Sequence, residues 1–177
     1  MGKVAVLYKS KYGTTKQYAE WIAEETGGTL FPVSKVKLAD LEDYDTIIIG
    51  GGIYASSIIG MTFLTKNFAR LSEKKLIAFS VGASFDNKKN TDSIRNHNLT
   101  PEMQKTVRYF HLRGGLFYGK MGNLDRMGLK TYIGMLKKKP EDQWDEETYG
   151  MIETYGKDTS FLDRATIAPI VAAVKTV

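Results

Sequence analysis

The chain has 177 residues, of which 42 % are hydrophobic, and it contains no cysteine. This length suffices to bury one sizeable core and predicts a single domain, while the lack of cysteine excludes disulfides, thiolate metal sites and thiol nucleophiles. The net charge of +5 and the pI near 9.2 suit either an anionic partner or an ordinary basic surface. No apolar run reaches membrane-spanning length, so we expect a cytoplasmic chain.

The first half of the chain alternates between strand and helix patterns. Continuous apolar runs at residues 4–8, 46–51 and 76–82 predict strands that are covered on both faces, which is typical of a parallel sheet. Helical patterns lie between them, at Ala19, Ile22 and Ala23 and at Leu64, Phe68 and Leu71, and Gly27 is a stop signal for the first helix. Residues 29–33 form a weaker strand, placed at an edge because Pro32 cannot donate to a ladder.

The second half is less regular. Pro101 is a helix-start signal, and Met103, Val107 and Phe110 follow with helical spacing into a predicted fifth strand around 109–118. Residues 119–160 form an extension with a basic amphipathic stretch, Pro140, an acidic stretch and a short helix ending near Gly156. The closing helix is predicted in 163–175, with Asp163 as its cap and Pro169 dividing the first turn from the rest.

The loop "SKYGTTKQ" at 10–17 joins the first strand to the first helix. A helix N-terminus offers free N–H groups and a positive dipole end, so such a loop can bind an anion, with added donors from Ser10, Thr14 and Thr15. Neither the triphosphate pattern G-x-x-x-x-G-K-[ST] nor the dinucleotide pattern G-x-G-x-x-G is present, which favours a terminal phosphomonoester. The alternative is that these hydroxyl groups simply cap the helix.

Two further glycine-containing loops follow strands of the same predicted sheet. "GGGIYASS" at 50–57 and "SVGASFDN" at 80–87 belong to the carboxyl edge, where doubly wound sheets bind their ligands. Glycines 50–52 would let the backbone approach a flat ring, and Tyr54 or Phe85 could flank its face. Glycine-rich strand ends can also be mere turns, but three such loops at one edge favour a binding site.

These residues resemble the flavodoxins and flavodoxin-like proteins, which bind FMN. The stretch "SKYGTTKQYAEWIA" carries the sharpest similarity, and the order of elements agrees over nearly the whole chain. The resemblance implies an α/β fold, a doubly wound five-stranded parallel sheet in the order 2-1-3-4-5 with helices on both faces. It assigns the FMN phosphate to Ser10, Tyr12, Gly13, Thr14 and Thr15, one side of the flavin ring to Gly51, Gly52, Ile53, Tyr54, Ala55 and Ser56, and the other side to Val81, Gly82, Ala83, Ser84 and Phe85.

Three functions can be compared on this basis. An electron-transfer flavoprotein that serves a redox partner protein is the first, and an FMN oxidoreductase that passes electrons to a quinone or oxidises a porphyrinogen-like substrate is the second. The stretch "LDRMGLKTYIGMLKK" at 124–138 is similar in pattern to the menaquinone-dependent protoporphyrinogen oxidases of this fold. A phosphorylated receiver is excluded, because "VLYKS" and "IIIGGG" stand where it needs an acidic cluster and a phosphorylatable aspartate.

No acid, base or nucleophile stands out, so no catalytic side chain is assigned. His97 and His111 are isolated in sequence, and we expect ordinary surface or packing roles for them and no metal site. We expect no nucleic-acid partner. For the amphipathic stretch at 120–139, one hypothesis is that its apolar side packs on the domain; the other is a docking surface for an acidic protein or, peripherally, an anionic membrane.

Overall fold

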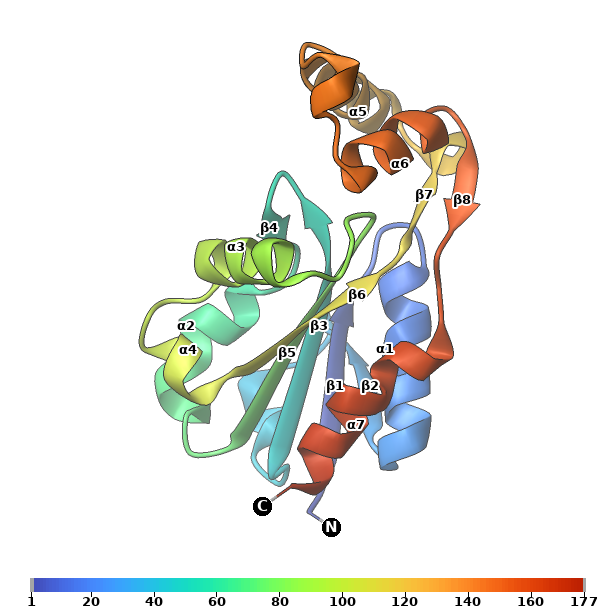
Figure 1. Cartoon of the computed structure of the whole chain (residues 1–177). Coiled ribbons are helices and arrows are strands. Elements are labelled where there is room, and N and C mark those ends of the chain that lie inside the picture. The colour runs from blue at the N-terminus through green and yellow to red at the C-terminus, as the bar shows by residue number, and fades with distance from the viewer. Residues whose placement is uncertain (1, 177) are drawn as a thin grey trace.

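The structure, a computed structural model, describes residues 2–176 and is built on a parallel sheet with strand order β2-β1-β3-β5-β6 (Figure 1). The strands are β1 (Val4–Lys9), β2 (Thr29–Pro32), β3 (Thr46–Tyr54), β5 (Lys75–Gly82) and β6 (Arg108–Arg113). The short strand β4 (Ser57–Ile58) pairs antiparallel with the end of β3. This architecture confirms the predicted doubly wound sheet, including the edge position of β2.

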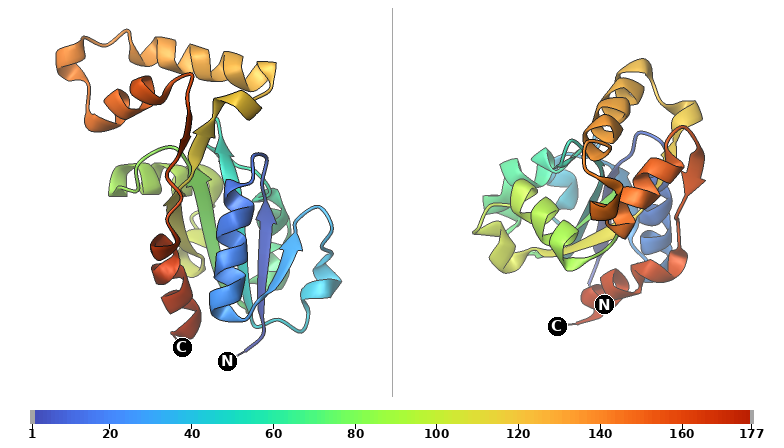
Figure 2. Two further views of the ribbon diagram at one scale, coloured as in Figure 1. Left: turned by 90° about the vertical axis from the view of Figure 1, so that its right-hand side faces the viewer. Right: turned by 45° about the horizontal axis from the view of Figure 1, so that its top comes forward.

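Helices cover both faces of the sheet (Figures 1 and 2). One face carries α1 (Thr14–Thr26) and α7 (Ala168–Lys175), and the other carries α2 (Thr62–Leu71), α3 (Lys88–Asn98) and α4 (Met103–Thr106). The predicted stop of the first helix is confirmed, since Gly27 adopts the left-handed conformation with φ +64°. Short 3₁₀ turns, η1 (Leu38–Leu41) and η4 (Arg164–Ile167), precede β3 and α7.

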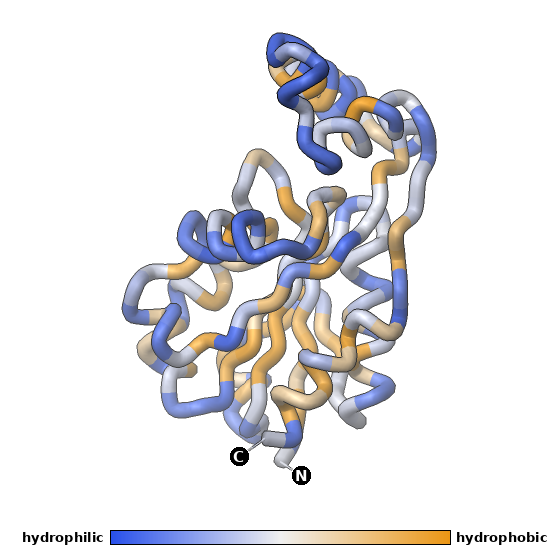
Figure 3. Tube along the Cα trace, viewed as in Figure 1, coloured by the Kyte–Doolittle hydropathy of each residue, from blue (hydrophilic) through white to orange (hydrophobic). Residues whose placement is uncertain are grey.

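The core consists of two layers because successive side chains of each strand point to opposite faces. Val4 and Val6 of β1 pack with Tyr18 and Ile22 of α1, whereas Leu7 belongs to the layer beneath α2 and α3. Figure 3 shows the resulting apolar strands at the centre of the molecule, with polar segments around them. Burial on both faces explains why the strand sequences are continuous rather than alternating.

Residues 115–160 leave the sheet and return to it. This segment, which begins before the predicted extension at 119–160, is called the extension from here on. Strands β7 (Gly115–Phe117) and β8 (Asp158–Ser160) form an antiparallel pair that carries α5 (Asn123–Leu136) and α6 (Glu146–Thr154), with 3₁₀ turns η2 (Tyr118–Lys120) and η3 (Glu141–Gln143). Figures 1 and 2 show the extension lying beyond the carboxyl edge of the sheet. It therefore stands over the edge where the three predicted binding loops are found.

Several sequence predictions need correction. The fifth strand does not run to residue 118, because it is interrupted at Gly114 and the residues that follow pair in a second sheet. The N–H of Gly114 donates to the carbonyl of Gly82 at 2.7 Å, and a Cβ at Gly114 would lie 2.6 Å from Val81 Cγ1, so only glycine fits there. The predicted continuation of helical spacing to Phe110 is also wrong, since α4 is one short turn that ends at Thr106.

Other predictions in the second half are confirmed. A helix covers most of the basic stretch, and α6 is the expected short helix before Gly156. Asp163 caps the 3₁₀ turn that begins the closing segment, where its Oδ1 accepts the Ala165 N–H at 2.9 Å. Pro169 lies in the first turn of α7, so the division at this residue is real.

Candidate functional site

The loop at residues 10–15 leaves the N-terminus of α1 without a side-chain cap. Gly13 is the N-cap residue with φ +99°, and its N–H donates to Ser10 Oγ at 3.0 Å. No side chain caps the helix, and within residues 2–176 the N–H groups of Thr14 and Thr15 meet no acceptor. The alternative in which the hydroxyl groups cap the helix is therefore wrong. Free N–H groups at the positive end of a helix dipole favour an anion at this loop.

A charged cluster adjoins this loop and ties the extension to it. Lys11 Nζ lies 2.5 Å from Asp125 Oδ2 of α5, and the Tyr12 hydroxyl donates to the same carboxylate. These hydrogen bonds, from Lys11 first and Tyr12 second, hold the pKa of Asp125 below its usual range. Lys11 Nζ also lies 5.0 Å from the ring centroid of Tyr54, whose pKa is raised by burial. One cation thus joins the first loop, the second loop and the extension.

The second loop is more regular than predicted. Strand β3 continues to Tyr54, so Gly51, Gly52 and Ile53 are strand residues, and Ala55 and Ser56 form the turn of a hairpin with β4. Gly51 is glycine for packing reasons, because a Cβ there would lie 2.0 Å from the Ile59 carbonyl oxygen.

At Gly52, in contrast, a Cβ would meet its nearest neighbour, the Tyr54 ring, only at 3.5 Å. Of these two strand residues, only Gly52 would accept a Cβ, which would lie in van der Waals contact with Tyr54, Thr15 and Ile59.

The third loop is held by a buried hydrogen-bond chain that sequence reasoning missed. Val81 and Gly82 end β5, and Ala83, Ser84 and Phe85 follow them. The buried His111 of β6 lies beneath this loop, with Nε2 3.1 Å from the Ser84 carbonyl and Nδ1 2.8 Å from Ser80 Oγ. His111 is a packing residue, as expected, and its hydrogen bond to the Ser84 carbonyl also positions the third loop.

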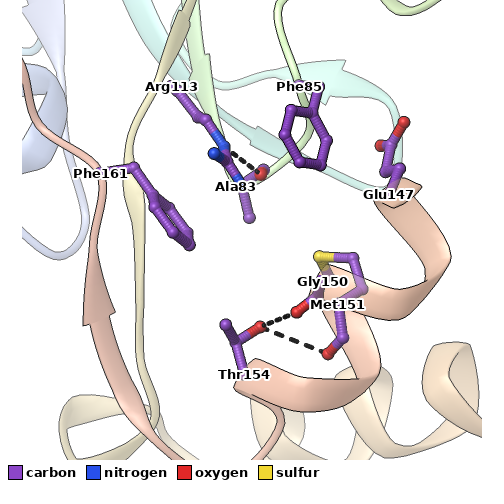
Figure 4. A pocket seen from close by; sticks show the side chains of 8 residues that line it. All are labelled: Ala83, Phe85, Arg113, Glu147, Gly150, Met151, Thr154 and Phe161. Carbon is purple, nitrogen blue, oxygen red and sulfur yellow. Dashed lines mark hydrogen bonds between the residues drawn. The ribbon is translucent and has the colours of Figure 1, made fainter.

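Arg113 occupies the space between the third loop and the extension (Figure 4). Its guanidinium carbon lies 3.9 Å from the ring centroid of Phe85 and 3.8 Å from that of Phe161, and its Nε donates to the Ala83 carbonyl at 3.4 Å. The cavity around these groups leaves no room for a water molecule; its lining residues are Ala83, Phe85, Arg113, Glu147, Gly150, Met151, Thr154 and Phe161. The two rings therefore hold the guanidinium between them.

The three loops converge on one edge of the sheet. A Cβ at Gly52 would lie 3.7 Å from Thr15 Oγ1, which brings the second loop to the start of α1. Gly114 is hydrogen-bonded to Gly82, and a Cβ at Gly114 would lie 3.5 Å from Thr14 Oγ1. The third loop therefore also lies at the start of α1. The fold and this convergence define a doubly wound α/β protein in which three loops meet at the carboxyl edge of the sheet, one of them at an uncapped helix N-terminus.

Comparison with known proteins assigns the family. The family model described as "Flavodoxin domain" matches residues 5–143, and the chain belongs to this family. The assignment confirms the flavodoxin resemblance, and FMN is the cofactor of the chain. The residues fit that group, because the free N–H groups at the start of α1 suit its phosphate.

The fold is also found in a solved structure of low sequence identity. A WrbA-like flavodoxin from Agrobacterium tumefaciens is 16 % identical, with 97 % of this chain and 98 % of that chain covered and a TM-score of 0.51. A flavodoxin from the domain Archaea is 17 % identical, with 63 % and 85 % covered and a TM-score of 0.41. An FMN-complexed flavoprotein from Lactobacillus acidophilus is 17 % identical, with 64 % and 93 % covered and a TM-score of 0.42. Comparison with curated proteins gives no match.

Three site-adjacent residues were not predicted, namely Asp125, His111 and Arg113. Each acts on a loop far away in the sequence, so no local spacing could reveal it. Within residues 2–176, no cluster of three or more histidine, aspartate or glutamate side chains is placed to hold a metal ion. None of the described helices combines the length and the apolar character that crossing a membrane requires.

Proposed function

We propose that this protein is an electron-transfer flavoprotein that binds FMN through the loop at residues 10–15 and exchanges electrons with a redox partner protein. The observation that carries the proposal is the uncapped N-terminus of α1, at the edge where the other two loops converge. In this proposal Ser10, Tyr12, Gly13, Thr14 and Thr15 hold the phosphate. When bound, FMN supplies the redox chemistry, and the protein contributes binding, orientation and electrostatics.

The residues at 51–56 and 81–85 would contact the two sides of the flavin ring. Tyr54 and Phe85 offer aromatic rings at these two loops. The Asp125 link to Lys11 and Tyr12 would hold α5 over the phosphate loop. The extension would then limit how closely a partner approaches the cofactor.

A second candidate function is an FMN oxidoreductase of the quinone-linked protoporphyrinogen oxidase type. The observation that favours it is the exposed face of α5, where Leu124, Met127 and Met135 point away from the protein. An apolar face with lysines at its end suits peripheral contact with an anionic membrane, where a quinone would be reached. An assay with a soluble quinone and with a porphyrinogen separates this candidate from the first.

Replacement of both threonines of the phosphate loop tests the proposed function. In Thr14→Ala/Thr15→Ala, FMN binding should weaken by about 2–4 kcal/mol if each hydroxyl bonds a charged phosphate, measured by flavin fluorescence titration. Riboflavin, which lacks the phosphate, should bind the variant as it binds the wild type. The matched control Thr14→Ser/Thr15→Ser keeps both hydroxyls and should retain most of the affinity. Equal losses for FMN and riboflavin would reject this site.

A further inference from the structure

Arg113 is the cation most firmly fixed beside the third loop. Its guanidinium is stacked between Phe85 and Phe161, and its Nε is bonded to the Ala83 carbonyl. The backbone is anchored as well, because the Tyr18 hydroxyl donates to the Arg113 carbonyl at 2.7 Å. Such a group has little freedom to move away when the charge near it changes.

The charge of Arg113 is not neutralised by the protein. Glu147 lines the same cavity, yet in the described part of the chain no carboxylate pairs with this guanidinium. The two terminal nitrogens also meet no acceptor within residues 2–176, and neither is fully enclosed. Because aromatic rings cover both faces of the guanidinium, water screens its charge less than it screens an exposed lysine.

We propose that Arg113 tunes the redox potential of the cofactor by stabilising its reduced, anionic form. The inference rests on the proposed function, in which the loop at 81–85 contacts the flavin ring. A flavin ring that has gained two electrons and one proton carries one negative charge, whereas the oxidised ring is neutral. A fixed, poorly screened cation next to that loop favours the reduced form and raises the potential.

The test compares how tightly the protein binds oxidised and reduced FMN. Titration gives the affinity for oxidised FMN. The two-electron potential of the bound FMN, measured against a reference dye, then gives the affinity for the reduced form. In Arg113→Gln, the preference for the reduced form should fall about tenfold, which corresponds to about 30 mV for a two-electron couple. Binding of oxidised FMN should change far less. Arg113→Lys keeps the charge and should retain most of the wild-type potential.

The matched control is Arg126→Gln. Arg126 also stacks on an aromatic ring, with its guanidinium 5.0 Å from the Tyr118 ring centroid, but it bonds carbonyls within the extension. The same loss of charge there should leave the potential unchanged. If Arg113→Gln unfolds, Phe161→Leu serves instead: it keeps the charge but admits water, and a smaller fall of the potential is expected.

Three results would overturn the inference. The first is an unchanged potential in Arg113→Gln, and the second is an equal shift in Arg126→Gln, which would assign the effect to net charge. The third is an equal fall in Arg113→Lys, which would make Arg113 a purely structural clamp. If the wild type binds no FMN at all, the proposed function itself fails, and the initial titration detects this separately.

Discussion

His111 shows how one buried side chain can define the direction of a whole hydrogen-bond chain. The Ser84 carbonyl can only accept, so Nε2 of His111 carries the proton and Nδ1 accepts from Ser80 Oγ. Ser80 then accepts from the Tyr109 hydroxyl, at 2.5 Å. Burial lowers the pKa of His111, which keeps the ring neutral and this single arrangement in place.

The pH dependence of stability tests this assignment. Because the native pKa of His111 is lowered, the unfolded state takes up the proton first as pH falls below about 6.5. The contribution of neutral His111 to the free energy of unfolding is therefore complete above that pH and is lost as pH falls toward the native pKa. The free energy of unfolding changes there by at most about 1.4 kcal/mol per pH unit. In urea unfolding between pH 7 and 5, His111→Gln should show a flatter dependence than the wild type.

A non-titrating change in the same network provides the control for this experiment. Tyr109→Phe removes the hydroxyl at the far end of the chain but leaves the imidazole in place. It should lower the free energy of unfolding by about 1 kcal/mol at every pH and keep the wild-type slope. A wild-type slope in His111→Gln would show that His111 does not carry the pH dependence.

At the scale of elements, the β3–β4 hairpin carries backbone strain in the second loop of the site. Both residues of its turn have positive φ, +46° at Ala55 and +67° at Ser56, a conformation that suits Asn-Gly rather than Ala-Ser. The hairpin is held from outside by Asn98 of α3, whose side chain accepts from the Ile58 N–H and donates to the Ser56 carbonyl. Backbone in such a conformation recurs at ligand sites, and this turn follows the strand that carries Gly52 and Tyr54.

Relief of the unfavourable φ should stabilise the protein. Ala55→Gly removes the Cβ from a left-handed position, and we expect the free energy of unfolding to rise by about 0.5–1 kcal/mol in chemical denaturation. The control is the same change at an exposed helical site, Ala172→Gly in α7, which should lower it by about 1 kcal/mol. If both substitutions change the free energy of unfolding in the same direction, the left-handed turn is contradicted.

At the scale of the whole molecule, the extension places an unusual surface at the carboxyl edge. The side chains of Leu124, Met127 and Met135 are 79 %, 61 % and 55 % exposed, whereas Ile133 on the opposite side of α5 is buried. The hypothesis that the apolar side of this segment packs on the domain is therefore wrong for these three residues. Lys137, Lys138 and Lys139 follow at the C-terminal end of the helix.

Binding to lipid vesicles tests the membrane hypothesis for this surface. Each lysine near an anionic surface contributes about 1 kcal/mol, so changing Lys137, Lys138 and Lys139 to Gln should weaken co-sedimentation with anionic vesicles about 100-fold. High salt should also weaken it, and neutral vesicles should bind less. The control changes Lys3, Lys105 and Lys175 to Gln. These exposed lysines lie just before β1, in α4 ahead of β6, and at the C-terminal end of α7, and these segments lie away from the extension in Figure 1. A wild type that stays in the supernatant under all conditions would leave a soluble redox partner as the better proposal.

The sheet and the position of the loop at residues 10–15 could be predicted because their signals are local. Burial on both faces requires continuous apolar runs, and the runs at 4–8, 46–51 and 76–82 are the centres of β1, β3 and β5. The stretch around "YGTT" predicts the joint between β1 and α1, whereas the structure shows that α1 starts without a side-chain cap. The family resemblance depends on the same local features.

Helix α3 and the course of the chain after β6 could not be read from the sequence. Helix α3 is strongly polar and buries one apolar residue, Ile94, while Asn98 fixes its end to the hairpin. The strand predicted to run to 118 contains no stop signal except glycines, and its interruption at Gly114 is seen only in the contacts of that residue with Gly82 and Val81. These features depend on neighbours that are distant in sequence.

The sequence by itself determined the doubly wound sheet, the loop at the start of α1 and the family, because periodicity and backbone demands act over a few residues. Only the tertiary structure decided which face of α5 is buried, that Asp125 contacts Lys11, and that Arg113 lies between Phe85 and Phe161. Amphipathic spacing shows that a helix has two faces but not what covers them. That choice is made by packing and charge between segments brought together only when the chain folds.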